Sequence, residues 1–142
     1  MSSVKLVAVF VENKLGETAH ITQGLAKAGV NIRWVTIASS GPFGVMKFLV
    51  DKSEPALLAL REKGLTVSHL EALAVEVKDK PGGLHAVADA LARNNVNVDN
   101  ISGFVANKRA VLVIELRDAA RGQAVLEKEG LRLLSQEEML NL

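Results

Sequence analysis

Hydrophobic residues follow two different periods along the chain, and the changes between these periods predict its secondary structure. Residues 4–11 and 70–77 are rich in β-branched side chains and predict strands. A turn that contains glycine follows each strand, and apolar residues three and four positions apart then predict a helix that packs on a core. In the second of these helices the apolar residues are Leu84, Val87, Ala88 and Leu91. Gly29 and Asn95 take the helix-ending position, where a left-handed residue is expected.

Each half of the chain then continues with the same elements. Two strands come next in each half, at residues 31–39, 44–50, 97–106 and 110–116. A second helix begins at Ser53 in the first half, and a short strand closes each half, at residues 65–67 and 131–134. The order βαββαβ, given twice, is the plan of a ferredoxin-like unit. Beyond the second copy, Ser135 and Glu138 form a capping-box pattern that predicts a short C-terminal helix.

A shift of 66 residues superposes the two halves without a gap. The segment AVFVENKLGE (8–17) then lies over AVEVKDKPGG (74–83), and GLAKAGVNIR (24–33) lies over ALARNNVNVD (90–99). Two copies are too few for a solenoid, which needs about three. The repeat therefore predicts two compact domains, at residues 1–68 and 69–142.

The pleat of the strands assigns their side chains to two faces of the sheet. By the repeat register, Phe48 faces the helices and Phe10 lies on the opposite face. That opposite face is apolar in both copies, and its members are Leu6, Ala8, Phe10, Val45, Leu49, Ala72, Ala74, Val111 and Val113. An apolar face of this width predicts burial against a partner. We therefore expect a homodimer in which sheets pack face to face.

Composition narrows the function classes. The chain is 49% hydrophobic and 23% charged, which is enough apolar material for a core. Seventeen basic and sixteen acidic residues give a net charge of +1, so there is no electrostatic footprint for nucleic acid or for a membrane surface. The absence of cysteine excludes disulfides, thiol catalysis and cysteine-ligated zinc. The apolar run at the N-terminus is too short for a membrane span or a signal segment, and we expect a cytoplasmic protein.

Two loops carry the candidate chemistry. The segments NKLGE (13–17) and DKPGG (79–83) each join the first strand of a copy to its first helix. Asn13 and Asp79 stand at or just before the helix, where their side chains can accept from free backbone amides. The same amides, with the positive end of the helix dipole, can instead hold the carboxylate of a ligand. A glycine turn before a helix is also common without any ligand, so both interpretations stay open.

The motif of Asp or Asn, Pro, Gly and Leu, followed by a helix and by Val-Asn-Val or Val-Asn-Ile, resembles the ACT domain. Two copies resemble the small stand-alone tandem ACT proteins. The second copy carries Asp79, Pro81, Gly82, Leu84, Val96, Asn97 and Val98, and the first carries Asn13, Gly16, Gly29, Val30, Asn31 and Ile32. The first copy departs from the pattern at Leu15 and Thr18. The resemblance implies regulation by a small ligand, usually an amino acid, bound between ACT units that pair edge to edge.

Pairing through the second strands would place Asn31 and Asn97 near the glycine loop of the opposite unit. An asparagine amide there can donate to a carboxylate and accept from an ammonium group, although a simple turn residue is an equally good interpretation. The expected ligand-binding residues are Asn13, Leu15, Gly16, Glu17, Asn31, Ile32, Asp79, Pro81, Gly82, Gly83, Leu84, Asn97 and Val98.

Other function classes fit the sequence less well. An RNA-recognition module needs aromatic residues on the open face of its first and third strands, where the second copy offers Glu76 and Ile114. An acylphosphatase-like enzyme would resemble a single unit with an arginine in the first loop, and neither loop contains one. No phosphate-loop, dinucleotide, nucleophile-elbow or zinc-helix motif occurs.

We therefore expect an α+β protein with two ferredoxin-like, ACT-like units paired side by side, an antiparallel sheet and helices on one face. The expected function is regulation through a free amino acid bound at the seam between the units, without catalysis, metal or cofactor. A homodimer and a regulated metabolic enzyme are the expected partners. Two alternatives stay open, a regulatory subunit of an amino-acid biosynthetic enzyme such as acetolactate synthase and a dimerisation scaffold without a ligand.

Overall fold

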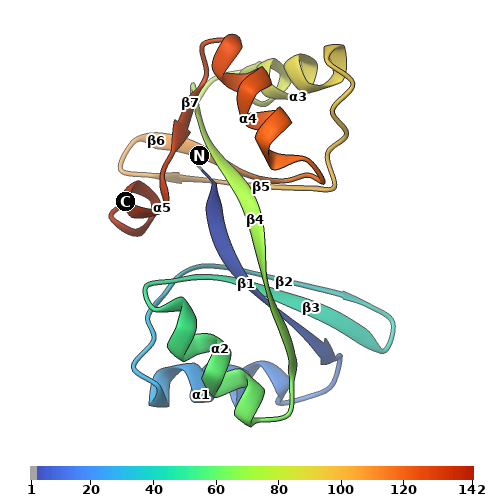
Figure 1. The fold of residues 1–142 in the computed structure, drawn as a ribbon, viewed down its shortest axis with the longest axis vertical. Coiled ribbons are helices and arrows are strands. Elements are labelled where there is room, and N and C mark those ends of the chain that lie inside the picture. The colour runs from blue at the N-terminus through green and yellow to red at the C-terminus, as the bar shows by residue number, and fades with distance from the viewer. Residues whose placement is uncertain (1–2) are drawn as a thin grey trace. The chain divides into compact units, whose positions relative to one another are not determined.

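The computed structural model describes residues 3–142, and the chain folds as two units (Figure 1). The first unit comprises Lys5–Leu70, and the second comprises Glu71–Leu142 together with residues 3 and 4. Within the described residues, no helix is long and apolar enough to cross a membrane.

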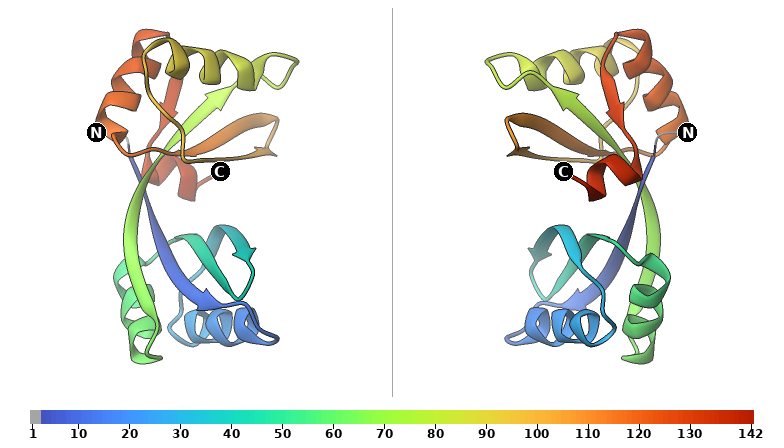
Figure 2. Two further views of the ribbon diagram at one scale, coloured as in Figure 1. Left: turned by 90° about the vertical axis from the view of Figure 1, so that its right-hand side faces the viewer. Right: turned by 90° about the vertical axis from the view of Figure 1, so that its left-hand side faces the viewer.

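The first unit is a four-stranded sheet with two helices. Its elements are β1 (Val4–Glu12), α1 (Glu17–Lys27), β2 (Ile32–Ser40), β3 (Phe43–Val50), α2 (Ser53–Glu62) and the first part of β4 (Thr66–Val77). The strand order is β2-β3-β1-β4, and β3 pairs antiparallel with both β1 and β2. Helices α1 and α2 lie side by side on one face of this sheet (Figure 2).

The second unit repeats this plan and adds one helix. Its elements are the rest of β4, α3 (Gly83–Arg93), β5 (Asn100–Ala106), β6 (Arg109–Glu115), α4 (Ala119–Lys128), β7 (Arg132–Leu134) and α5 (Gln136–Leu140). The strand order is β7-β4-β6-β5, with antiparallel pairing throughout. The βαββαβ plan predicted for each copy is confirmed.

The strands predicted at residues 65–67 and 70–77 are one continuous strand, β4, in the structure. The segment between them contains neither glycine nor proline, so nothing turns the chain there. The predicted helix ends are confirmed, because Gly29 has φ +72° and Asn95 has φ +57°, both in the left-handed region.

Each unit has its own hydrophobic core between its sheet and its helices. In the first unit Phe48 is fully buried and packs with residues of α1 and α2 such as Leu25 and Leu60. In the second unit Ile114, the residue 66 positions after Phe48, is fully buried in the equivalent place. The assignment of Phe48 to the helix-facing side of the sheet is confirmed.

The opposite sheet face is buried, contrary to the expectation that it lies open in the single chain. Of its nine predicted members, Leu6, Ala8, Leu49, Ala72, Ala74, Val111 and Val113 are each at most 2% exposed. Phe10 is 55% exposed and Val45 is partly exposed. The exposed apolar face on which the predicted homodimer rested is therefore not present, because seven of the nine side chains are already buried in the single chain.

Helix α5 explains part of this burial in the second unit. It lies on the sheet face opposite α3 and α4 (Figures 1 and 2). Met139 of α5 is 3% exposed, and Leu134 of β7, which lies opposite Ala74 in the strand pairing, is fully buried. The predicted C-terminal helix is confirmed with its capping box between Ser135 and Glu138. Sequence reasoning wrongly left this face without a helix to cover it, because a five-residue helix has no long apolar stripe to reveal where it docks.

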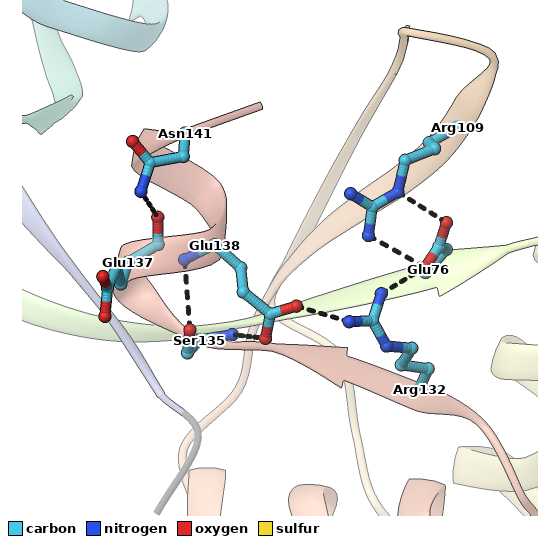
Figure 3. A network of polar contacts seen from close by, with 7 residues as sticks. All are labelled: Glu76, Arg109, Arg132, Ser135, Glu137, Glu138 and Asn141. Atoms are coloured by element: carbon cyan, nitrogen blue, oxygen red, sulfur yellow. Dashed lines mark hydrogen bonds and ion pairs between the residues drawn. The ribbon is translucent and has the colours of Figure 1, made fainter.

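A network of ion pairs ties α5 to the sheet (Figure 3). Arg109 of β6 donates two hydrogen bonds to the carboxylate of Glu76 in β4, at 2.8 and 3.1 Å. Arg132 of β7 donates to Glu76 at 2.8 Å and, with its other amino group, to Glu138 of α5. The hydrogen bonds from Arg109, and then those from Arg132, lower the pKa of Glu76 to about 2. The same network, led by the backbone hydrogen bond from Ser135, lowers the pKa of Glu138.

Candidate ligand-binding site

The first glycine loop turns the chain from β1 into α1. Gly16 is the N-cap of α1 and has φ +86°, a conformation that glycine adopts at little cost. No side chain caps the helix amides. Asn13, expected near these amides, instead donates its side-chain amide to the carbonyl of Gly41 in the β2–β3 hairpin, at 3.0 Å. Leu15 is fully exposed. The capping role expected for Asn13 is therefore wrong, because its side chain bonds to the hairpin instead of to the helix amides.

The second loop has the same geometry. Gly82 is the N-cap of α3, has φ +91°, and is followed by a helix start without a side-chain cap, so Asp79 does not cap it either. A Cβ on Gly83 would lie 2.3 Å from the carbonyl oxygen of Lys78, so only glycine fits there. Leu84 is 52% exposed.

A hollow adjoins each loop, at the same repeat position. In the first unit it has a volume of about 380 Å³ and is lined by Phe10, Val11, Glu12, Lys14, Glu17, His20, Lys63, Gly64, Leu65 and Thr66. In the second it has a volume of about 310 Å³ and is lined by Val77, Lys78, Lys80, Pro81, Gly82, Gly83, Ala86 and Leu131. Six positions correspond by the shift of 66, for example Lys14 with Lys80 and Leu65 with Leu131. The two hollows are thus copies of one feature of the fold.

The hollows include several residues that sequence reasoning did not select. Lys14, His20 and Lys63 line the first, and Lys78 and Lys80 line the second. In the first hollow Lys14 lies 3.6 Å from both Glu12 and Glu17. The repeat register would have identified Lys14 and Lys80, because they are an identical pair inside the two loops.

The predicted asparagines lie at the other end of each sheet. Within a unit, the glycine loop meets the β2–β3 hairpin, whereas Asn31 bonds to Asp51 beside the start of α2. Ile32 and Val98 are partly buried and pack against the two cores. The strands that follow the asparagines, β2 and β5, pair only with β3 and β6 among residues 3–142. Pairing through these second strands, which was expected to bring each asparagine to a glycine loop, is absent from that part of the chain.

No group of three or more metal-ligating side chains occurs within residues 3–142. What the fold offers at the repeated position is an uncapped helix start, a left-handed glycine and a lysine beside a hollow. Helix starts of this kind favour anionic groups.

Two ferredoxin-like units in one chain, each with the same loop and hollow, define a tandem domain-pair protein. The ACT domain pair family model matches residues 2–142, and the chain belongs to this family. The resemblance inferred from the loop motifs is confirmed.

Solved structures extend the comparison. Protein BT0572 from Bacteroides thetaiotaomicron is 26% identical over 99% of this chain and 98% of its own, with a TM-score of 0.92. The ligand-free regulatory subunit of aspartate kinase from Thermus thermophilus is 18% identical over 91% of this chain and 93% of its own, with a TM-score of 0.62. Aspartate kinase from Synechocystis is 16% identical over 90% of this chain and 25% of its own, with a TM-score of 0.60. The two kinase matches show a shared fold. No curated protein matches the sequence.

Proposed function

We propose that the protein is a regulatory module that senses a free amino acid, and that it is not an enzyme. The observation that carries this proposal is the hollow beside the glycine loop, present at the same position of both units. Membership of the ACT domain pair family supports a regulatory role. The match to the regulatory subunit of aspartate kinase from Thermus thermophilus, 93% of which is covered, supports a metabolic enzyme as the partner that is regulated.

The loop suits the carboxylate of an amino acid for a physical reason. The first amide of each helix donates to the carbonyl of Lys14 or Lys80, and the amides that follow it lack a side-chain acceptor. The left-handed glycine before them has no Cβ to keep a ligand away. Lys78 and Lys80 add positive charge to the hollow of the second unit. Hydrogen bonds to a charged acceptor contribute about 1.5–3 kcal/mol each.

We predict that one or more of the twenty amino acids raises the melting temperature of the protein, and that Gly82→Ala abolishes or strongly reduces this shift. The added Cβ would stand beside the amides that receive the carboxylate, and the left-handed backbone at φ +91° costs an alanine about 1–2 kcal/mol. Thermal unfolding with each amino acid in excess measures the effect, because a ligand that binds only the folded state stabilises it.

Gly29→Ala is the matched control for this variant. Gly29 also has a positive φ, of +72°, and nothing lies within 4 Å of its added Cβ. The control should lose similar stability and keep the full ligand shift. A wild-type protein that responds to none of the twenty amino acids would refute the proposed function, and an unchanged shift in Gly82→Ala would move the site away from this loop.

The free edge of β2 supports a homodimer by a route other than the buried sheet face. Within residues 3–142, β2 pairs with β3 alone, and its Val35 and Ile37 are 46% and 47% exposed. An unprotected apolar edge strand is prone to pair with another chain. We propose that a second copy pairs with this edge, which would bury both side chains and satisfy the open backbone groups.

We predict that Ile37→Lys converts the dimer to a monomer, because a lysine at an edge strand opposes pairing. Light scattering coupled to gel filtration, with the protein at tens of micromolar, measures the mass. Leu58→Lys is the control, since Leu58 of α2 is 60% exposed and lies away from the strand edge. A monomeric wild type, or an Ile37→Lys variant that stays dimeric, would count against this interface.

A further inference from the structure

A third hollow lies at the other end of the second unit, away from the glycine loop. It has a volume of about 320 Å³ and is lined by Asn95, Val96, Asn97, Asp99, Arg117, Asp118 and Arg121. These residues come from the segment between α3 and β5 and from the segment between β6 and the first turn of α4. Six of the seven side chains are charged or carry an amide, and they include both signs of charge.

Four of the polar side chains have no protein partner. The guanidinium of Arg117, the carboxylate of Asp99 and the amides of Asn95 and Asn97 form no hydrogen bond or ion pair with any residue from 3 to 142. Asp118 is engaged, since its carboxylate accepts from the backbone amide of Arg121 at 3.0 Å. Arg121 donates with one amino group to the carbonyl of Asn94, which leaves its other donors available and fixes its position. The groups open to a ligand are therefore two cations, one anion and two amides.

The first unit lacks this arrangement. The residues 66 positions before Asn97 and Arg117 are Asn31 and Asp51. The carboxylate of Asp51 accepts from the backbone amide of Asn31 at 2.9 Å, and the Asp51 amide donates back to the Asn31 carbonyl at 3.2 Å. An acidic residue that closes the loop thus stands where the second unit has an unpaired arginine. The hollow is a particular property of the second unit and not a consequence of the shared fold.

We propose that this hollow binds an acidic α-amino acid, of the aspartate and glutamate class. Such a ligand carries two carboxylates and one ammonium group, which match the two cations and the one anion that the hollow leaves unpaired. Arg117 can take one carboxylate through two parallel hydrogen bonds, and Arg121 can donate to the other. Asp99 then pairs with the ammonium group, and the Asn97 amide can donate to a carboxylate or accept from the ammonium group.

Other ligand classes match the hollow less well. A neutral amino acid has one carboxylate and leaves one guanidinium unmatched. A dicarboxylate without an amino group leaves Asp99 beside a second anion, which is unfavourable. A polyphosphate would meet the carboxylates of both Asp99 and Asp118. The inference extends the proposed function by a second site and a ligand class, and its residues do not overlap with those of the glycine loop.

Calorimetric titration of the full-length protein tests this site. We expect L-aspartate or L-glutamate to bind about tenfold more tightly or better than L-asparagine and L-glutamine, which have the same shape without the second charge. Arg117→Gln should weaken this binding by about tenfold or more. Arg61→Gln, at an exposed arginine of α2 in the first unit, should leave it unchanged. Asp99→Asn should weaken binding of the acidic amino acids without weakening binding of succinate or glutarate.

The outcomes separate this inference from the proposed function. Equal affinity for the acids and their amides, or full affinity in Arg117→Gln, overturns the acidic site. If another amino acid then still binds and Gly82→Ala removes that binding, the proposed function stands without the second site. Acid binding that Arg117→Gln abolishes and Gly82→Ala leaves intact supports a site at this hollow. If no amino acid of any class binds, both proposals are wrong.

Discussion

Phe48→Ala is expected to lower the free energy of unfolding of the first unit by about 3–5 kcal/mol. Phe48 is fully buried in the first core, and its strand neighbours in register are Val7 and Val35. Truncation to alanine removes most of an aromatic side chain from close-packed surroundings and leaves a cavity that neighbouring strands and helices can fill only in part. The loss is a large fraction of the stability of a small unit.

Trp34 makes this measurement specific to the first unit. It is the only tryptophan of the chain and lies in β2, half-buried. Urea unfolding followed by tryptophan fluorescence therefore reports the unit that contains Phe48. Phe43→Ala is the control, since Phe43 begins β3 with 65% of its surface exposed and should cost little. A Phe48→Ala variant within about 1 kcal/mol of the wild type would contradict the assignment of Phe48 to the core.

The fold was predictable because two independent signals agreed. The period of the apolar residues gave the elements, and the repeat at 66 residues gave the same elements twice. The side-chain faces followed from the pleat, as the burial of Phe48 and Ile114 shows. The continuity of β4 does not follow from the repeat, because the repeat predicts one closed unit in each copy. In the structure the chain passes from one unit to the next without a turn residue.

The candidate site was predictable only in part, because a hollow is made by segments that are distant in sequence. The loops around Gly16 and Gly82 and their left-handed glycines follow from the motif. The contribution of Lys63 and Gly64 to the first hollow depends on how the end of α2 and the start of β4 lie against the β1–α1 loop, which no local pattern encodes. The predicted contact of Asn13 with the helix amides was wrong for the same reason, since the hairpin carbonyl to which Asn13 donates lies 28 residues away in the sequence.

The sequence indicates the hollow at Arg117 less clearly than it indicates the glycine loops. Aligning the two copies pairs Arg117 with Asp51 and Asp118 with Lys52, so the charge is reversed at two successive positions of this loop. Such a reversal marks a place where the two units differ in chemistry. It does not reveal that Asp51 is engaged with the Asn31 amide while Arg117 remains unpaired, because hydrogen bonding depends on the three-dimensional course of the loops.

Glu76 is expected to make the stability of the second unit depend on acidity. Its pKa is lowered from 4.5 to about 2 in the folded protein, chiefly by the hydrogen bonds from Arg109 and then by those from Arg132. A carboxyl group with a lowered folded pKa stabilises the fold fully above the pKa of the unfolded chain, here 4.5. This contribution falls as the pH drops from about 4.5 toward 2 and is lost below the folded pKa. One quarter of the side chain is exposed, so solvent screening reduces the contribution to about 2 kcal/mol at neutral pH.

Glu76→Gln should therefore cost about 2 kcal/mol at pH 7 and progressively less as the pH falls toward 2. The pKa of Glu138 is also lowered, so its contribution to stability is likewise lost as the pH falls, and part of the acid sensitivity should persist in this variant. Urea unfolding monitored by circular dichroism at a series of pH values gives the difference between wild type and variant. Glu62→Gln, at an exposed residue at the end of α2, is the control and should show little difference at any pH. A cost of Glu76→Gln that is the same at pH 7 and at pH 2.5 would mean that the bonds in Figure 3 do not hold Glu76 ionised, and that α5 is attached by apolar contacts such as those of Met139 alone.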